Sequence, residues 1–162
     1  MRLGLAAAVA VPFVGISATP AMAAPASGSF TVVARDFEFT GVPRVLAAGT
    51  YHVNFVNRGK DEHDFVALNL GPQCGATVKS IKDAKNLKRQ IDGAPDPEAA
   101  FAAACPGGSF EGGAGAEPGG RDREDFTLTP GKTVYFCGVV DEAGAHSDLG
   151  MLGLINVRGA RR

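Results

Sequence analysis

Residues 134–157 read VYFCGVVDEAGAHSDLGMLGLINV. An apolar, strand-like run ends at Cys137 and another begins at Met151, so the residues between them predict a loop that joins two strands. Eight residues separate Cys137 from His146 on this loop, and four separate His146 from Met151. A loop of this length can bring a thiol, an imidazole and a thioether to the same point in space.

A second histidine that fits the same point is His63, in the motif EHDF (62–65), just before another apolar run. One cysteine, two histidines and one methionine are the ligand set of mononuclear electron-transfer copper sites. In such sites the thiolate and the two imidazoles form a trigonal plane, and a weak thioether lies on its axis. The candidate copper ligands are therefore His63, Cys137, His146 and Met151.

Each of these residues also has an ordinary structural interpretation. A lone cysteine at a strand end or a methionine before a leucine is usually a core side chain, and a single histidine in a turn is usually solvated. The joint order and spacing of the four ligand types favours the metal site. The remaining histidine, His52, alternates with Tyr51 and Val53 along a strand pattern, so we expect it on the outer surface of a sheet.

Outside an insert at about residues 71–121, the chain reads as short strands separated by turns. Period-two alternation and β-branched or aromatic residues mark these strands. They lie at residues 29–39, 44–57, 63–70, 125–129, 134–140 and 151–158. Short strands with frequent turn signals and no long helix among them predict an all-β fold, a two-sheet antiparallel β-sandwich.

The insert, residues 71–121, has a different character. Apolar residues at helical spacing predict a lysine-rich helix over 77–91, and Asp96 predicts the N-cap of a second helix that ends at Ala104. The segment GGSFEGGAGAEPGG (107–120) predicts a flexible glycine-rich loop with little capacity to pack. The basic residues of the first helix are either the solvated face of a surface helix, which we favour, or a docking patch.

The first 23 residues predict a secretory signal peptide. Arg2 precedes the apolar run LGLAAAVAVPFVGI, and the sequence AMA (21–23) fits a cleavage site. A membrane anchor is the alternative, but Pro12 interrupts a run that is already short for a bilayer span. We therefore expect residues 1–23 to be removed and residues 24–162 to form one domain in a secreted or periplasmic location.

The composition does not identify the function, but the charge argues against nucleic acid as a partner. The 162 residues are 45% hydrophobic and 20% charged, as expected for a globular domain of ordinary size. A formal net charge of −1 gives no reason to expect nucleic acid, which favours clustered positive charge. No feature specifies an oligomer, so we expect a monomer.

The chain has three cysteines, an odd number for an exported protein. Cys74 and Cys105 bracket the helical part of the insert, whereas Cys137 stands among the candidate ligands. The simplest allocation is a disulfide between Cys74 and Cys105, with Cys137 left as a thiolate for the metal. The sequence alone leaves other pairings open.

An early histidine, followed by cysteine, histidine and methionine on one loop (137–151), resembles the pattern of the cupredoxin family, the blue copper proteins. The resemblance covers about residues 29–70 and 125–158. The cysteine-to-histidine spacing resembles that of the electron-transfer copper site in copper nitrite reductases. The resemblance implies a Greek-key β-sandwich that binds one copper ion through the four candidate ligands, with the methionine as the axial thioether.

Two features depart from the family pattern. Asp64 follows the first histidine, where the family often has asparagine or serine, and a carboxylate near the thiolate predicts a lowered reduction potential. Asp141 and Glu142 lie on the ligand loop, and we expect both to point outward. The resemblance also implies a small apolar surface around the loop histidine, through which electrons pass. Its members here are Ala145, Leu149 and Leu152.

The sequence thus predicts an exported one-electron carrier with an unidentified redox partner protein, and not an enzyme. A copper oxidase or nitrite reductase needs additional histidines for further copper centres, and only His52 is spare among the three present. A copper-delivery protein is disfavoured because Met151 is the single methionine after the signal peptide. A metal-free interaction module is the other alternative.

Overall fold

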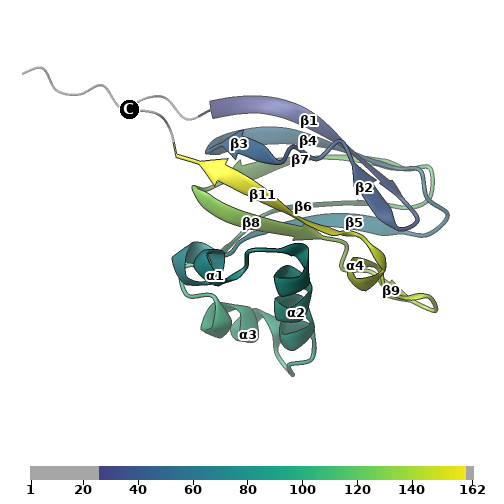
Figure 1. Cartoon of the computed structure of the whole chain (residues 1–162). Coiled ribbons are helices and arrows are strands. Elements are labelled where there is room, and N and C mark those ends of the chain that lie inside the picture. Colours follow the sequence, from purple (N-terminus) through teal and green to yellow (C-terminus); the bar gives the residue numbers. More distant parts are fainter. Residues whose placement is uncertain (1–25, 160–162) are drawn as a thin grey trace, which may run out of the picture.

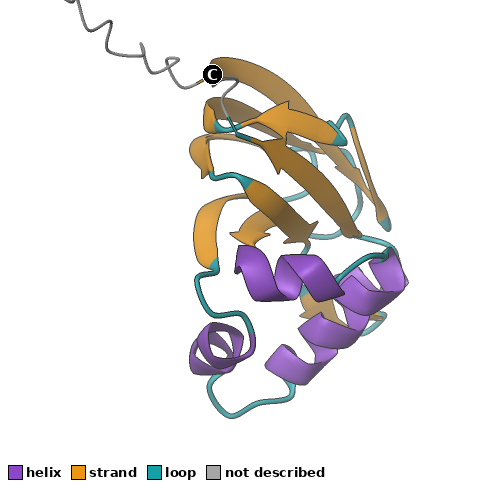
Figure 2. Cartoon of the chain, turned by 60° about the vertical axis from the view of Figure 1, so that its left-hand side comes forward, coloured by secondary structure: helices purple, strands orange, loops and turns teal. Residues whose placement is uncertain are grey.

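Two β-sheets pack face to face in the part of the chain that the structure describes, residues 26–159 of a computed structural model (Figure 1). The predicted signal peptide, residues 1–23, lies outside these described residues. The larger apolar cluster fills the space between the sheets. Three helices cover the outer face of one sheet (Figure 2).

The first sheet has the strand order β2-β1-β4-β7. Its strands are β1 (Ala26–Arg35), β2 (Glu38–Thr40), β4 (Gly49–Asn57) and β7 (Arg121–Leu128). The second sheet has the order β3-β11-β8-β5-β6. Its strands are β3 (Val45–Ala47), β5 (His63–Asn69), β6 (Ser109–Ala116), β8 (Gly131–Phe136) and β11 (Leu152–Arg158). The predicted sandwich with a small helical insert is confirmed.

One detail of the predicted sandwich needs correction, because the sheets are mixed rather than wholly antiparallel. β1 runs parallel to β4, and β11 runs parallel to β3. After β2 the chain leaves the first sheet, forms β3 at the edge of the second sheet, and returns as β4 beside β1. A connection that crosses between sheets can return a strand in the same direction, whereas a tight hairpin reverses it.

Alternation along β4 forms part of the inner face of the first sheet. Val53 and Phe55 are fully buried, whereas His52, which lies between Tyr51 and Val53, is exposed, as the period-two pattern predicts. Phe65 of the second sheet and Phe126 of the first meet in the core, with ring centroids 5.7 Å apart. Burying a side chain of this size stabilises the fold by about 1.5–3 kcal/mol, so these contacts hold the two sheets together.

The helical part of the insert contains three helices, where the sequence predicts two. They are α1 (Gly71–Thr77), α2 (Ile81–Asp92) and α3 (Pro97–Ala104). The helix predicted over 77–91 is α2, which begins later, at Ile81, because Ser80 caps it; α1 precedes it and was not predicted. The Ser80 hydroxyl accepts a hydrogen bond from the Asp83 N–H, and the Asp83 carboxylate accepts one from the Ser80 N–H. Asp96 caps α3 as predicted, by accepting a hydrogen bond from the N–H of Ala99.

A second apolar cluster attaches these helices to the outer face of the five-stranded sheet (Figure 2). Its buried members are Leu70, Cys74, Val78, Ala84, Cys105, Val134 and Leu152. Cys74 of α1 and Cys105, which directly follows α3, form a disulfide. The disulfide therefore joins the two ends of the helical segment and leaves Cys137 as the free, buried cysteine.

The prediction of a flexible glycine-rich loop over 107–120 is wrong. Most of this segment is β6, which pairs antiparallel with β5 at the edge of the second sheet. The hydrogen bonds of this ladder come from the backbone, so the strand forms without large side chains. Glycine also allows a close approach, because a Cβ atom on Gly112 would lie 2.5 Å from the ring of Phe126. β6 therefore passes the core where no larger residue fits.

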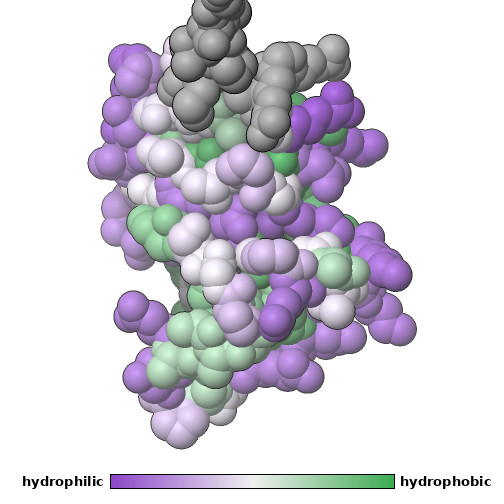
Figure 3. All heavy atoms as spheres, turned by 90° about the vertical axis from the view of Figure 1, so that its left-hand side faces the viewer, coloured by the Kyte–Doolittle hydropathy of each residue, from purple (hydrophilic) through white to green (hydrophobic). Residues whose placement is uncertain are grey.

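The surface of the insert is partly apolar. Figure 3 shows a pale green area at the lower end of the molecule, where the helices lie. α3 has the sequence PEAAFAAA, contains no buried residue and exposes most of its alanines. Within residues 26–159, no helix is both long enough and apolar enough to cross a bilayer.

Candidate metal centre

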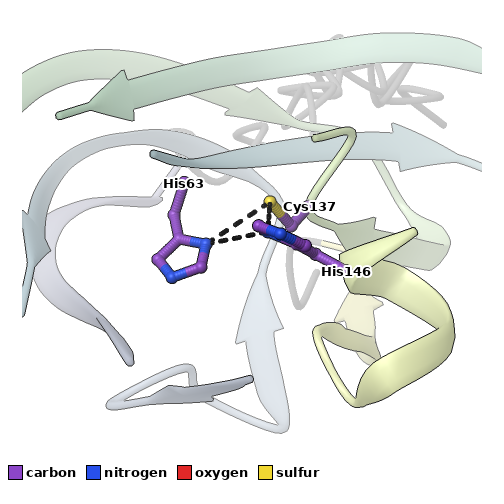
Figure 4. A group of neighbouring side chains, drawn as sticks. All are labelled: His63, Cys137 and His146. Atoms are coloured by element: carbon purple, nitrogen blue, oxygen red, sulfur yellow. Dashed lines mark hydrogen bonds between the residues drawn. The ribbon is translucent and has the colours of Figure 1, made fainter. Parts of the chain in front are cut away.

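Three of the predicted ligands meet in the structure (Figure 4). His63 is the first residue of β5, Cys137 directly follows β8, and His146 begins the short helix α4 (His146–Leu149). All three residues are fully buried, with 0% of their surface exposed. β5 and β8 are paired neighbours in the sheet, and this pairing places His63 close to Cys137. The loop that leads to β11 then brings His146 to both of them.

The three donor atoms converge on one point. The Nδ1 atoms of His63 and His146 are 3.0 Å apart, and Cys137 Sγ lies 3.9 Å from the first and 3.6 Å from the second. Metal bonds of about 2.0 Å to nitrogen and about 2.3 Å to sulfur, as zinc makes, put trigonally arranged donors about 3.5–3.7 Å apart. The two sulfur–nitrogen distances fit this triangle, and the Nδ1–Nδ1 distance is shorter than it requires. Residues 26–159 contain no second such group.

Met151, the fourth predicted ligand, is fully buried in the same apolar cluster as Cys137. Its backbone N–H donates to the carbonyl oxygen of His146 at 3.0 Å, and its carbonyl accepts from the N–H of Cys137 at 2.9 Å. These hydrogen bonds hold the backbone of Met151 beside both Cys137 and His146. The axial role of its thioether stays a prediction.

The Cys137 thiol is held by a neighbour on β5. The backbone N–H of Asp64 points to Cys137 Sγ at 3.4 Å, and Asp64 Oδ1 accepts from the N–H of Gly138 at 2.6 Å. Burial raises the pKa of the Cys137 thiol to about 12. Such a thiol is protonated at neutral pH unless a cation binds beside it, so the site suits a metal better than free thiolate chemistry.

The outer nitrogen of each imidazole contacts a carboxylate. His63 Nε2 lies 3.0 Å from Asp36 Oδ1, and His146 Nε2 lies 2.7 Å from Asp141 Oδ2. The hydrogen bond with the histidine is the main cause that lowers the pKa of each carboxyl below its ordinary value. The carboxylate at the outer nitrogen therefore helps to fix the orientation of each imidazole ring.

The expectation that the loop acids point outward holds for Glu142, which is exposed, but not for Asp141. The loop forms a small ribbon of β9 (Val140–Asp141) and β10 (Gly144–Ala145), which turns Asp141 back toward the histidine. In the sequence, the one signal for this role of Asp141 is its place five residues before the candidate ligand His146. Asp36 lies 27 residues before the histidine it contacts, and no motif marks it.

An aromatic side chain covers both imidazoles. The ring centroid of Phe37 lies 4.9 Å from that of His146 and 6.4 Å from that of His63, both in edge-on arrangements. Phe37 follows Asp36 in the turn between β1 and β2. A Cβ atom on Gly150 would lie 2.4 Å from the Phe37 carbonyl oxygen, so the turn approaches the ligand loop closely. This turn closes the site on the side of the first sheet.

Helix α2 also contacts the ligand loop. Lys85 Nζ donates to the backbone carbonyl of Asp148 at 2.8 Å, and Arg89 Nε lies 3.0 Å from the Asp148 carboxylate. Asp148 belongs to α4, two residues after His146. The basic face of α2, expected to be solvated, is therefore used in part within the molecule.

The apolar surface expected around His146 is only partly present. Leu149 is 44% exposed, and Val140, which was not predicted, is 71% exposed. The prediction that Leu152 belongs to this apolar surface is wrong, because Leu152 is buried in the cluster that attaches the helices to the outer face of the second sheet. The imidazole itself is fully buried and does not reach the surface.

The sandwich is the cupredoxin fold, which it shares with a solved structure of a blue copper protein. Auracyanin A, a "blue" copper protein from Chloroflexus aurantiacus, is similar with a TM-score of 0.52 and 17% identity, over 82% of this chain and 100% of that one. Auracyanin B gives 0.48 and 22% identity, over 85% of this chain and 92% of its own. Auracyanin from Roseiflexus castenholzii has a TM-score of 0.46 and 22% identity, over 83% of this chain and 98% of its own.

At these identities the likeness establishes the fold alone, and auracyanin A is the comparison that carries it. No protein-family model matches the chain. No curated protein sequence matches it either.

Proposed function

We propose that the protein is an exported mononuclear blue copper protein that acts as a one-electron carrier. The observation that carries the proposal is the convergence of three buried donor atoms, from His63, Cys137 and His146, within 3.9 Å of one another. One thiolate with two imidazoles is the donor set of electron-transfer copper sites. The fold supports the same assignment, because it resembles that of auracyanin A, a blue copper protein.

In this proposal His63 and His146 would hold the copper through Nδ1, Cys137 through Sγ, and Met151 through its thioether. A copper ion held there supplies a Cu(II)/Cu(I) couple for one-electron transfer. The chain keeps the donors in place: their burial excludes water, and the Asp64 N–H donates to the cysteine sulfur. Donors that are fixed in this way need little rearrangement when an electron arrives or leaves.

The histidine inventory disfavours a copper enzyme. The chain has three histidines, and the proposed site uses two of them. The third, His52, lies on the exposed face of β4 and pairs with Asp125. One exposed histidine cannot build the further copper centre that an oxidase or nitrite reductase needs. We therefore propose a carrier and not an enzyme.

The location and partner belong to the same proposal. The disulfide between Cys74 and Cys105 supports an oxidising compartment, and the predicted signal peptide supports export to a secreted or periplasmic location. The partner is an unidentified redox protein, and we propose a monomer. A copper-delivery protein would lack a reversible potential, and a metal-free interaction module would lack copper.

Voltammetry of the copper-loaded chain tests the carrier function. We expect one copper per chain and a reversible one-electron wave. Replacing Asp64 with asparagine removes a negative charge beside the thiolate and keeps an oxygen that can accept from the Gly138 N–H. We expect the midpoint potential to rise by about 60–120 mV, which is about one to two tenfold steps in a one-electron equilibrium.

The matched control is Asp125→Asn, which neutralises an exposed carboxylate on β7 and should leave the potential unchanged. An irreversible response with bound copper would favour the delivery protein. Absence of bound copper would favour the metal-free module. An unchanged potential in Asp64→Asn would contradict the effect assigned to that carboxylate.

A further inference from the structure

Both imidazoles present the same nitrogen to the site and the other nitrogen to a carboxylate. The Nδ1 atoms of His63 and His146 face each other near the cysteine sulfur (Figure 4). Their Nε2 atoms lie 3.0 Å from Asp36 and 2.7 Å from Asp141, respectively. The two pairs are built alike, although their members come from separate segments of the chain.

Each carboxylate is itself held by the backbone. Asp36 accepts from the N–H of Lys60 through both of its oxygens, at 3.0 and 3.1 Å. Asp141 accepts from the N–H of Ala143 at 2.8 Å, within the turn of the β9–β10 ribbon. Asp141 is therefore placed by its own turn, and Asp36 by the distant turn between β4 and β5; the two side chains are only 30% and 24% exposed, respectively.

The partner of an imidazole decides which nitrogen carries the proton. A carboxylate at Nε2 holds the proton there and leaves a lone pair at Nδ1, the form that binds a metal. The Nδ1 atoms of His63 and His146 lie 3.0 Å apart, which is a hydrogen-bond distance if one of them carries a proton, whereas two bare lone pairs there repel each other. Without an outer acceptor, each ring would gain stability by moving its proton inward or by turning over, and the carboxylates oppose both changes.

We propose that Asp36 and Asp141 are positioning residues that hold His63 and His146 with Nδ1 unprotonated and aimed at Cys137 before any metal binds. This inference rests on the proposed function for the identity of the metal. The positioning itself is a property of the metal-free protein, and it can be measured there.

Nitrogen-15 NMR of the histidine rings in the metal-free protein reads the tautomer directly. In the wild-type protein we expect His63 and His146 to carry the proton on Nε2. Asp36→Ala should shift the tautomer of His63 alone, and Asp141→Ala should shift that of His146 alone. The variants Asp36→Asn and Asp141→Asn keep an oxygen acceptor, so they should restore the wild-type tautomers.

The Cu(II) affinity, measured by competition with a chelator, is the second readout. Each alanine variant should lose roughly 10–100-fold, the usual effect of removing a partner that orients a metal ligand. The matched control is Asp125→Ala, which removes the same kind of partner from the exposed His52. That variant should keep the affinity and both site tautomers, and circular dichroism verifies that every variant is folded.

Wild-type rings with the proton on Nδ1, or alanine variants with wild-type tautomers, would overturn the positioning role. An affinity loss without a change of tautomer would overturn it as well, because the carboxylates would then act through charge alone. If the wild-type protein binds no copper but the tautomers shift as expected, the proposed function fails and the positioning role stands.

Discussion

Replacing His146 with alanine is expected to lower the Cu(II) affinity by more than about a hundredfold and to remove the intense visible absorption of a thiolate–copper site. The ring is fully buried, and its Nδ1 lies 3.6 Å from Cys137 Sγ. Loss of a residue that only orients a metal ligand costs roughly 10–100-fold in affinity, so loss of the ligand itself should cost more. Competition titration measures the affinity, and absorption follows the site.

His52→Ala is the matched control for this variant. It removes a histidine on the exposed face of β4, where the ring pairs with Asp125. We expect the affinity and the spectrum of this variant to equal those of the wild-type protein. A His146→Ala variant with wild-type affinity and colour would show that His146 is not a ligand, and an equal loss in His52→Ala would show that the metal binds elsewhere.

Replacing both Cys74 and Cys105 with alanine is expected to lower the free energy of unfolding by about 3–4 kcal/mol. The disulfide closes a loop between residues 31 apart in sequence, and restricting an unfolded chain over that length has about this effect. Urea denaturation measures the change. The copper spectrum should stay the same, because Cys137 takes no part in the disulfide.

The wild-type protein with its disulfide reduced is the control for the double variant and should show a similar loss of stability. An unfolding free energy equal to that of the oxidised wild-type protein would mean that the apolar contacts of the insert suffice without the disulfide. A changed copper spectrum in the double variant would mean that the insert shapes the ligand loop more strongly than its contacts through Lys85 and Arg89 indicate.

Much of the frame follows from local sequence patterns. The alternation along β4 predicts which side chains are buried, because successive residues of a strand face opposite sides. Asp96 predicts the start of α3, because its carboxylate accepts a hydrogen bond from a backbone N–H of the same turn. Cys137 and His146 are recognisable because one loop carries both at a spacing that permits them to meet.

Other features depend on contacts that no local pattern contains. β6 is a strand because its backbone pairs with β5, although its glycine content predicts a loop. Asp36 and Phe37 join the site through a turn that is distant in sequence from both histidines. Asp141 contacts His146 because the loop folds into a ribbon, which the acidic composition of the loop does not predict.

The central claim is a mononuclear copper site with Cys137 as its thiolate ligand. Visible absorption and electron paramagnetic resonance spectra of residues 24–162, recorded during addition of Cu(II) and compared with those of Cys137→Ser, test it most directly. We expect an intense thiolate-to-copper charge-transfer band that saturates at one equivalent and is absent from the serine variant. A colourless wild-type protein, or a band that persists in Cys137→Ser, would contradict the claim.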